Sequence, residues 1–541
     1  MKTRVLLCLA AAFFLAAAPL QAQSPVPFQP AAGPLWGNDV IISDIPAEDQ
    51  RDVCITTAFN GWIYAAYSYA SFAGGTGNIV LMRSDDNGQS WSELYRAATD
   101  YVLPSHLDII AAGSSTGNLK IYMAYVTLSA LTGGTWDVYV DRFNGVTGEM
   151  EANVFGETNG LLEICDVAIA TDNLFPATGA NPYTPGLAFT RRQMNYNEVI
   201  FTTSNGGGSF ADRRNVTRTV NCCRDVDVSY ARSLGNPDGR YFVTWSEFSG
   251  QTAVTGHIMV AHTALYYNDP FLSPARLDDG LLGVEGYCRA PRIAVQQNNA
   301  SNLGGGMTAV IVFERAADGD LDNRDVLGFC NLNAAFSDDW ELTAPASAVE
   351  SSEIQPDLCF EPGTSMFYVT YFDSTGQKLV TKMTGMDLVP ADPWEMLVSQ
   401  YNDAPGLTAP WPRVDVSPAW GMPAHVWISG PEQEGTALFD AQFAPVPIGP
   451  EMSGTGHQVK FYPNPASYHG TMEFVLPEAG NVRYRISDLR GSSLIPYQVI
   501  PCPAGVNQLG IDIGAMPPGL YILQLITGTY SRSLRIIVSR Y

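Results

Sequence analysis

The sequence predicts an all-β protein, in which a seven-bladed β-propeller is followed by a small Greek-key β-sandwich. Short runs of Val, Ile, Tyr, Phe and Thr recur between Gly, Asn, Asp and Pro, whereas helical periodicity is scarce. A polar residue followed by an alternating apolar strand returns seven times, at a spacing that suits a four-stranded blade. Six or eight blades are the alternative counts. After Pro445 the pattern changes, which indicates a second domain.

Each repeat begins with a polar residue at the start of its first strand. These residues are Asp52, Asp108, Asp166, Asp225, Arg292, Asp357 and Arg413. Because side chains alternate along a strand, each shares a face with the residue two positions further on. We expect this face to line the central channel, with the seven charged side chains at one mouth. Small residues then lie one layer deeper, such as Cys54, Ala168, Ala294 and Cys359.

The ends of the second strands reach the same mouth in an antiparallel blade. They add Arg191, Arg192, Glu247, Glu314, Arg315 and Asp373 to the charged ring. A concave mouth of this kind is the default binding site of the architecture. The ligand-binding candidates are Asp166, Asp225, Asp357, Glu247, Glu314, Arg315 and Asp373. The alternative is that these charges only make a wet channel mouth soluble.

The termini predict export and a domain order. Lys2 and Arg4 precede the apolar run 5–20, which is typical of a signal peptide that ends at Ala22. A membrane anchor is the alternative, but the run is short. We expect a signal peptide at 1–22, an N-terminal extension at 23–37 and the propeller at 38–445. A Pro- and Gly-rich linker at 446–457 then leads to the C-terminal domain at 458–541.

Charge and cysteine content limit the partners. The formal net charge of −24 disfavours nucleic acid and anionic lipid, although it also simply keeps a secreted protein soluble. Export permits disulfides, and we expect one or more bridges among Cys165, Cys222, Cys223 and Cys288. No CxxC pair supports a zinc site.

A turn motif follows the third strand of the first repeat. Ser84, Asp86, Gly88 and Trp91 occur in the order Ser-x-Asp-x-Gly-x-x-Trp, and residues 203–210 hold a weaker copy. The motif resembles the Asp-box, or BNR repeat, of sialidase-like propellers. That resemblance implies a structural role away from the active site: the carboxylate and hydroxyl close a hairpin, Gly88 takes a positive φ and Trp91 packs into its blade.

The same resemblance raises a sialidase-like exo-glycoside hydrolase as an alternative function. Such an enzyme needs an arginine cluster, a Tyr–Glu nucleophile pair and an acid. The catalytic candidates are Asp52, Asp108, Arg292 and Arg413, with Arg315 or Arg289 as a third arginine. No Tyr–Glu pair stands out, the family's Arg-Ile-Pro motif is missing from the first repeat, and an acidic mouth opposes an anionic sugar.

The C-terminal domain carries four ordered motifs, which begin at Phe461, Val482, Pro518 and Leu534. Together they resemble the type A sorting domain of type IX secretion. The resemblance implies partnership with the secretion machinery and delivery across the outer membrane, to the cell surface or the medium. An ordinary carbohydrate-binding sandwich is the alternative.

One loop of the fifth repeat is a candidate calcium site. Asp318, Asp320, Asp322 and Asp325 alternate around a Gly, although the closing Glu of an EF-hand is missing. A solvated acidic turn is the alternative. The sequence thus predicts an exported propeller that binds an extracellular glycan or protein at its channel mouth. A glycoside hydrolase and a structural adhesin are the competing functions.

Overall fold

The computed structural model describes residues between Val40 and Ser539, with gaps whose longest members are 172–183, 297–306, 385–395, 398–409 and 442–458. The expected signal peptide, the N-terminal extension and the whole linker at 446–457 therefore lie outside the described residues. The described part is built from β-strands and one short 3-10 helix, Thr116–Asn118. No helix in this part is long and apolar enough to cross a membrane.

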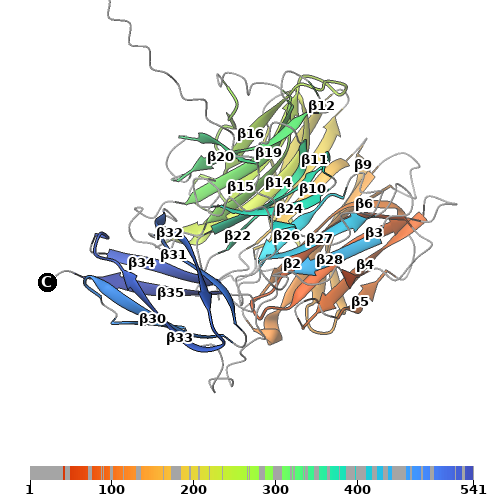
Figure 1. Ribbon diagram of the computed structural model, residues 1–541. Coiled ribbons are helices and arrows are strands. Elements are labelled where there is room, and N and C mark those ends of the chain that lie inside the picture. The colour runs from red at the N-terminus through yellow and green to blue at the C-terminus, as the bar shows by residue number, and fades with distance from the viewer. Residues whose placement is uncertain are drawn as a thin grey trace, which may run out of the picture.

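The N-terminal domain is a set of antiparallel β-sheets arranged around a centre (Figure 1). Blade 1 contains β2 (Asp49–Thr57), β3 (Ile63–Ala70), β4 (Thr76–Ser84) and β5 (Ser92–Arg96), and blade 2 contains β6 (Tyr101–Ala112), β7 (Lys120–Leu128), β8 (Trp136–Asn144) and β9 (Met150–Leu161). Blade 3 contains β10 (Ile164–Ala170), β11 (Gly186–Gln193), β12 (Tyr196–Ser204) and β13 (Phe210–Asn215), and blade 4 contains β14 (Cys222–Ser233), β15 (Asn236–Phe248), β16 (Gly256–His262) and β17 (Ala275–Arg276).

The remaining blades follow in the same order. Blade 5 contains β18 (Cys288–Gln296), β19 (Thr308–Ala316), β20 (Arg324–Asn331) and β21 (Glu341–Ala346), and blade 6 contains β22 (Glu353–Glu361), β23 (Met366–Asp373), β24 (Lys378–Thr384) and β25 (Met396–Leu397). Blade 7 contains β26 (Arg413–Val416), β27 (Pro423–Ser429) and β28 (Thr436–Ala441), and its fourth strand is the N-terminal β1 (Val40–Ile41). Pairing of β1 with β28 joins the two ends of the domain.

The first strands of the blades form the inner wall. Among the described residues, β2, β6, β10, β14, β18, β22 and β26 contact one another in that order, and β26 contacts β2. The ring is therefore closed, which confirms the predicted propeller class. The number of blades in the whole chain stays a prediction.

Apolar side chains between neighbouring blades form the core. One cluster joins blades 4 and 5 and contains Phe242, Ile293 and Phe313, all buried. Such burial stabilises the fold by about 25 cal/mol per Å² of apolar surface removed from water. The core thus consists of contacts between sheets, as the alternation of the first strands predicts.

The inner strands share a distortion that shifts their register. A β-bulge precedes Asp108, Asp227, Arg292 and Asp357 in blades 2, 4, 5 and 6. Two positions before each of these residues, and before Arg413, the backbone is left-handed, at His106, Asp225, Ala290, Gln355 and Trp411. The expectation of seven equivalent starting residues is therefore wrong in register, because Asp225 corresponds to His106 rather than to Asp108.

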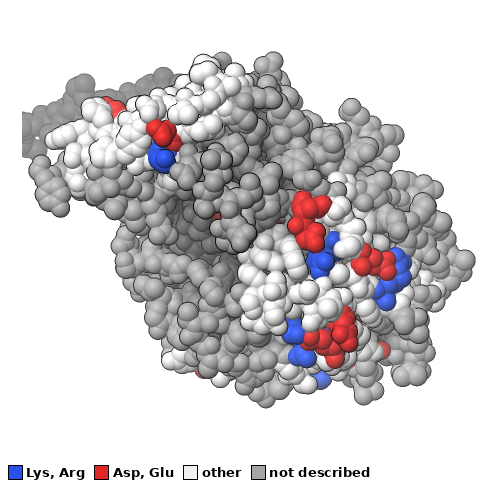
Figure 2. Space-filling model, turned by 90° about the horizontal axis from the view of Figure 1, so that it is seen from below, with Lys and Arg blue, Asp and Glu red and all other residues white. Residues whose placement is uncertain are grey.

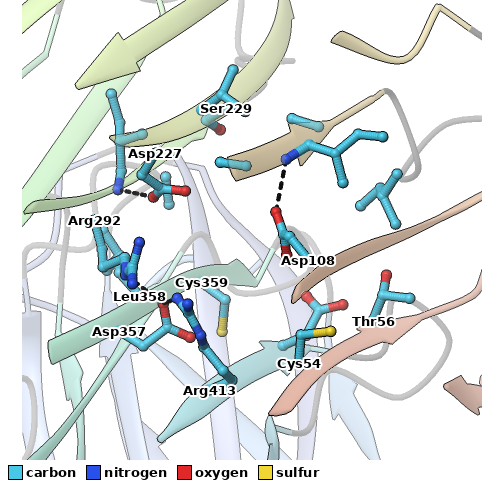
Figure 3. Close-up of a pocket in the computed structure, with 18 of the residues that line it drawn as sticks. Cys54, Thr56, Asp108, Asp227, Ser229, Arg292, Asp357, Leu358, Cys359 and Arg413 are labelled. Carbon is cyan, nitrogen blue, oxygen red and sulfur yellow. Dashed lines mark hydrogen bonds and ion pairs between the residues drawn. The ribbon is translucent and has the colours of Figure 1, made fainter. Parts of the chain in front are cut away.

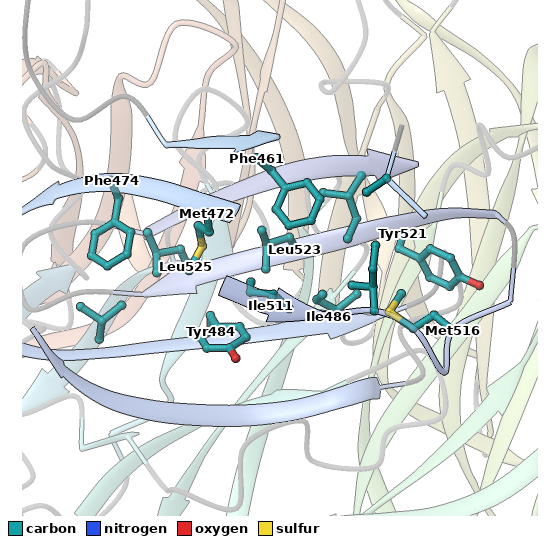
Figure 4. Close-up of a cluster of buried hydrophobic side chains, with 14 of the residues drawn as sticks. Phe461, Met472, Phe474, Tyr484, Ile486, Ile511, Met516, Tyr521, Leu523 and Leu525 are labelled. Atoms are coloured by element: carbon teal, nitrogen blue, oxygen red, sulfur yellow. The ribbon is translucent and has the colours of Figure 1, made fainter. Parts of the chain in front are cut away.

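The C-terminal domain is a sandwich of two sheets, in agreement with the prediction. One sheet contains β29 (Lys460–Tyr462), β30 (His469–Leu476) and β33 (Gly505–Asp512), and the other contains β31 (Gly480–Ser487), β32 (Ser493–Cys502), β34 (Gly519–Ile526) and β35 (Ser531–Val538). Phe461, Met472, Ile486 and Leu523 meet in the core between the sheets (Figure 4). A Cβ at position 470 would lie 1.9 Å from the Phe461 ring, so only glycine fits there.

The predicted disulfides are not formed among the described cysteines. Cys222, Cys223 and Cys288 are buried free thiols. Cys223 belongs to a core cluster of blades 3 and 4, whereas Cys288 belongs to the cluster of blades 4 and 5. The adjacent Cys222 and Cys223 thus fill core positions, and the expectation of a bridge involving these three residues is wrong.

Candidate functional site at the channel mouth

The carboxylates of the mouth layer join neighbouring blades. Asp52 Oδ2 accepts a hydrogen bond from the His106 backbone N–H at 3.2 Å. Asp166 accepts one from the Asp225 N–H at 2.7 Å, and Asp225 accepts one from the Ala290 N–H at 3.2 Å. Each carboxylate therefore binds the left-handed backbone of the next blade. These hydrogen bonds hold neighbouring blades together. They use carboxylate oxygens that were expected, from the sequence, to bind a ligand.

A second layer of charged residues lies deeper in the channel. Asp108 accepts a hydrogen bond from the Ile169 N–H, Asp227 from the Ile293 N–H and Asp357 from the Val414 N–H, each at 2.7 Å. Figure 3 shows these side chains around a shared space together with Arg292 and Arg413. Asp357 Oδ1 lies 3.9 Å from Arg292 Nε and 3.7 Å from Arg413 Nη1. The channel cavity has a volume of about 180 Å³.

Burial alters the ionisation of this layer. Burial raises the pKa of Asp108 to about 7, although Arg413 and the Ile169 N–H favour its charged form. Burial also raises the pKa of Asp415 to about 6, against the hydrogen bonds that its carboxylate accepts from Thr57. The pKa of Asp227 is raised for the same reason. Burial therefore disfavours the charged forms of Asp108, Asp227 and Asp415.

His106 is the exception at the mouth. Its Nδ1 lies 3.4 Å from Asp166 Oδ1. Burial lowers the pKa of this imidazole, but Asp166, Asp52 and Asp225 outweigh burial and raise the pKa to about 9. His106 is thus a cation among three carboxylates, and it offsets part of their mutual repulsion.

A separate pocket of about 250 Å³ opens at the mouth between blades 4, 5 and 6. Its apolar wall is formed by Phe248, Tyr287, Val254 and Trp411. Trp411 lies two residues before β26 and is 46 % exposed. Polar residues complete the lining: Arg224, Asp225, Arg289, Glu314, Arg324 and Gln355.

Glu314 is the centre of the polar wall. Its side chain is buried at 1 % exposure. Oε2 accepts hydrogen bonds from Arg289 Nε at 2.8 Å and from Arg324 Nη1 at 2.9 Å. Oε1 accepts one from the Gln355 N–H at 2.7 Å, and Gln355 Oε1 accepts one from the Trp411 N–H at 2.9 Å. Blades 5, 6 and 7 are thereby connected beneath the pocket.

Two of the predicted ligand-binding residues, Asp225 and Glu314, line this pocket. The others have different partners. Glu247 accepts a hydrogen bond from Asn221, Asp373 closes a turn at the Gly376 N–H, and Arg315 lies 4.0 Å from Asp325. Asp166 and Asp357 join blades. The catalytic candidates Asp108, Arg292 and Arg413 line the channel, and Asp52 belongs to the mouth layer.

Aromatic and arginine residues of the pocket were missed by the sequence analysis. Arg224 adjoins the starting residue Asp225, and Gln355 and Trp411 lie two positions before Asp357 and Arg413. Tyr287 lies five positions before Arg292. Gln355 and Trp411 share the left-handed position two residues before the starting residue. A repeat alignment that places Asp227, not Asp225, beside Asp108 would have found Gln355 and Trp411.

The motif from Ser84 to Trp91 forms a turn of the kind that its resemblance to the Asp-box implies. Ser84 Oγ donates to Asp86 Oδ1 at 2.8 Å, and the Gly88 N–H donates to Ser84 Oγ at 2.7 Å. Gly88 has a φ of 83°. Trp91 packs against the core cluster of blades 1 and 7. Hydrogen bonds from Ser90 and Ser84 outweigh the effect of burial and lower the pKa of Asp86.

The calcium candidates are only partly described. Asp318 and Asp322 lie outside the described residues. Asp320 is exposed, and Asp325 is the partner of Arg315. Among the described residues, no group of three or more His, Cys, Asp or Glu side chains is placed to hold a metal ion. The calcium site of the fifth repeat stays a prediction.

Charges of both signs lie together elsewhere on the protein. On the face shown in Figure 2, basic and acidic side chains of the described residues lie side by side. Arg191 pairs with Glu157 and Glu198, and Glu151 pairs with Lys120 and Arg142. These pairs lie on strands of blades 2 and 3, so Arg191, which was expected in the charged ring, has partners within the protein.

Comparisons with solved structures find similar architectures at low similarity. A Penicillium chrysogenum α-L-arabinanase complexed with arabinobiose is 12 % identical, with a TM-score of 0.41, and the match covers 75 % of this chain and 98 % of that chain. The Fusarium graminearum α-L-arabinofuranosidase Arb93A is 11 % identical, with a TM-score of 0.41 and coverage of 62 % and 93 %. A Trypanosoma rangeli sialidase mutant with trans-sialidase activity is 8 % identical, with a TM-score of 0.38 and coverage of 94 % and 90 %. Similarities at this level carry no argument about function.

Sequence comparisons identify the C-terminal domain. No curated protein sequence matches the chain at a significant level. The family described as secretion system C-terminal sorting domain matches residues 460–539, which are the residues of the described sandwich. The predicted resemblance is thus confirmed, and this domain marks the chain for export by type IX secretion, to the cell surface or the medium.

Proposed function

We propose that the exported propeller binds an extracellular carbohydrate in the mouth pocket. The observation that carries this proposal is the exposed indole of Trp411, which shares a pocket with Tyr287 and Phe248. Flat aromatic faces stack on the C–H faces of sugar rings, and a few polar groups beside them fix the hydroxyls. The arginine and glutamate side chains of the opposite wall supply such groups.

The position of Trp411 also supports binding rather than packing. Its backbone is left-handed, with a φ of 43°, and Gln355 holds its N–H. The same backbone conformation occurs at His106, Ala290 and Gln355, but the Trp411 side chain is 46 % exposed. This indole is therefore available at the mouth.

The test uses the full mature chain on a glycan array, followed by calorimetry with each saccharide that binds. Trp411→Ala is expected to weaken binding at least tenfold, the loss of about 1.4 kcal/mol or more that a buried aromatic contact contributes. Tyr266→Ala is the matched control, because Tyr266 is also an exposed aromatic residue (43 %) and does not line the pocket. No saccharide binding, or binding that Trp411→Ala leaves unchanged, would contradict the proposal.

A sialidase-like or other glycoside hydrolase is the second candidate, and one observation favours it. Asp225 and Glu314 line the same pocket, and burial raises the pKa of Asp225. Glycosidases use two carboxyl groups, of which one stays protonated as an acid. Turnover of fluorogenic glycosides that disappears in Asp225→Asn and in Glu314→Gln would establish hydrolysis. Array binding without turnover favours a binding module. If the protein shows neither saccharide binding nor turnover, a structural adhesin is the remaining function.

A further inference from the structure

We propose that Glu314 makes the mouth pocket select uncharged saccharides over carboxylated ones. This inference rests on the proposed carbohydrate-binding function and adds the class of saccharide. It assigns Glu314 a role in specificity, since its charge acts on the ligand through the two arginines that it holds.

The arginines of the pocket are already paired from below. Arg289 Nε and Arg324 Nη1 both donate to the same oxygen of Glu314, at 2.8 and 2.9 Å. A guanidinium normally recognises a carboxylate by such charge-assisted bonds. Because the protein supplies the carboxylate itself, a ligand carboxylate has to compete with a buried, fixed one. The remaining N–H groups of Arg289, whose side chain is 41 % exposed, are able to donate to hydroxyl oxygens.

Arg224, the third arginine of the pocket, is also engaged by the protein and is a poor partner for a ligand carboxylate. The guanidinium of Arg224 lies over the Phe248 ring, 4.8 Å from its centroid, and donates to the Gln251 backbone carbonyl. Asp225, adjacent in sequence, adds a second carboxyl group to the same wall. Three arginines and two carboxyl groups thus share the lining, and Glu314 offsets one of the three positive charges, in a protein whose formal net charge is −24.

Glu314 is fixed too firmly to leave the arginines. Its other oxygen accepts the Gln355 N–H at 2.7 Å, in a left-handed part of β22. Gln355 in turn holds Trp411, so moving Glu314 away would also disturb the aromatic wall. Selectivity of this kind depends on a repulsive element built into the site, as well as on attractive contacts.

The experiment compares matched sugars on one array: glucose and glucuronate, galactose and galacturonate, mannose and mannuronate. The full mature protein is expected to prefer the neutral member of each pair that binds. Glu314→Gln keeps an acceptor for the Gln355 N–H but removes the charge, so the ratio of uronate to neutral binding should rise about tenfold, which corresponds to about 1.4 kcal/mol.

Two further variants separate specificity from structure. The double variant Glu314→Gln with Arg289→Gln restores the original net charge and should return the ratio toward the wild-type value. Asp325→Asn removes a carboxylate from another ion pair of blade 5, outside the pocket, and should leave the ratio unchanged. A purely structural role of Glu314 would lower binding of both members of a pair together.

The outcomes distinguish this inference from the function on which it rests. Two results overturn the selectivity but keep the proposed function, provided that saccharide binding depends on Trp411. One is a wild-type preference for uronates, and the other is a ratio of uronate to neutral binding that Glu314→Gln does not change. No binding of any pair overturns the proposed function and the selectivity with it. A raised ratio that the double variant reverses supports both.

Discussion

Removing Asp357 tests whether the channel charges are structural. Asp357 accepts the Val414 N–H at 2.7 Å and lies within 4.0 Å of both Arg292 and Arg413. Asp227 makes the same kind of inter-blade bond, to the Ile293 N–H at 2.7 Å. Comparing Asp357→Ala with Asp227→Ala therefore separates the contribution of the arginine pairs from that of the backbone bond.

The two substitutions should differ in cost. Loss of a charge-assisted hydrogen bond costs about 1.5–3 kcal/mol, whereas removing one partner of a buried ion pair costs about 3–5 kcal/mol. Burial already disfavours the charge of Asp227, because its pKa is raised. We therefore expect a loss of about 1–3 kcal/mol for Asp227→Ala and about 2 kcal/mol more for Asp357→Ala.

Calorimetric melting of the propeller transition measures both variants, alongside saccharide affinity of the folded protein. The channel layer lies below the mouth pocket, and neither Asp227 nor Asp357 lines that pocket. Affinity should therefore stay within about twofold, below the 1.4 kcal/mol that a tenfold change requires. The reasoning is refuted if Asp227→Ala costs as much as Asp357→Ala. A folded variant that loses binding would equally refute the structural assignment.

Three other predictions concern pH, the Asp-box and the thiols. Burial raises the pKa of Asp108 to about 7 and that of Asp415 to about 6 in the folded state. The contribution of these two protonated carboxyl groups to folding stability is therefore present below pH 4 and is lost as the pH rises through those values. His106 acts in the same direction up to about pH 9, so melting temperatures at constant ionic strength should fall from pH 5.5 to 8.5, and a flat profile would contradict this. Asp86→Ala removes the hydrogen bonds to Ser84 and Ser90 and should lower the free energy of unfolding by about 1–2 kcal/mol, measured by thermal unfolding. Saccharide affinity should stay unchanged. A loss of affinity would show that the turn is part of the binding site. A thiol reagent should label the seven buried cysteines only slowly in the native protein, since burial raises the pKa of Cys54, Cys223, Cys288 and Cys359. After denaturation without reductant, the reagent should label all seven. Fewer labelled thiols would indicate a disulfide bridge.

The architecture was predictable because it depends on alternation and repetition. The residues expected on the second strands of the repeats, such as Arg191, Glu247 and Glu314, do lie on the second strands β11, β15 and β19. The Asp-box turn followed from Ser84, Asp86 and Gly88, since these residues determine a local conformation. The sorting domain was predictable for a different reason, because four ordered motifs identify a family without knowledge of packing.

The register of the inner strands was not predictable from alternation. In blade 4 both Asp225 and Asp227 precede an apolar residue, so a period of two fits either start. The left-handed backbone at Asp225 decides between them, and no single residue type marks it, since His106, Ala290, Gln355 and Trp411 share the conformation. A glycine at these positions would have indicated the bulge, but none of the five is glycine.

This shift in register also decides which residues are available to a ligand. Carboxylates that follow the bulge, such as Asp108 and Asp357, point into the channel and bind the next blade. Residues on the bulge itself face the mouth, where blades 6 and 7 supply Gln355 and Trp411 instead of acids. The acidic half of the mouth is therefore occupied by contacts between blades, whereas the half between blades 4 and 7 retains an open, aromatic pocket. Ligand binding is best sought where Gln355 and Trp411 replace the inter-blade carboxylate, because the Trp411 side chain is exposed there.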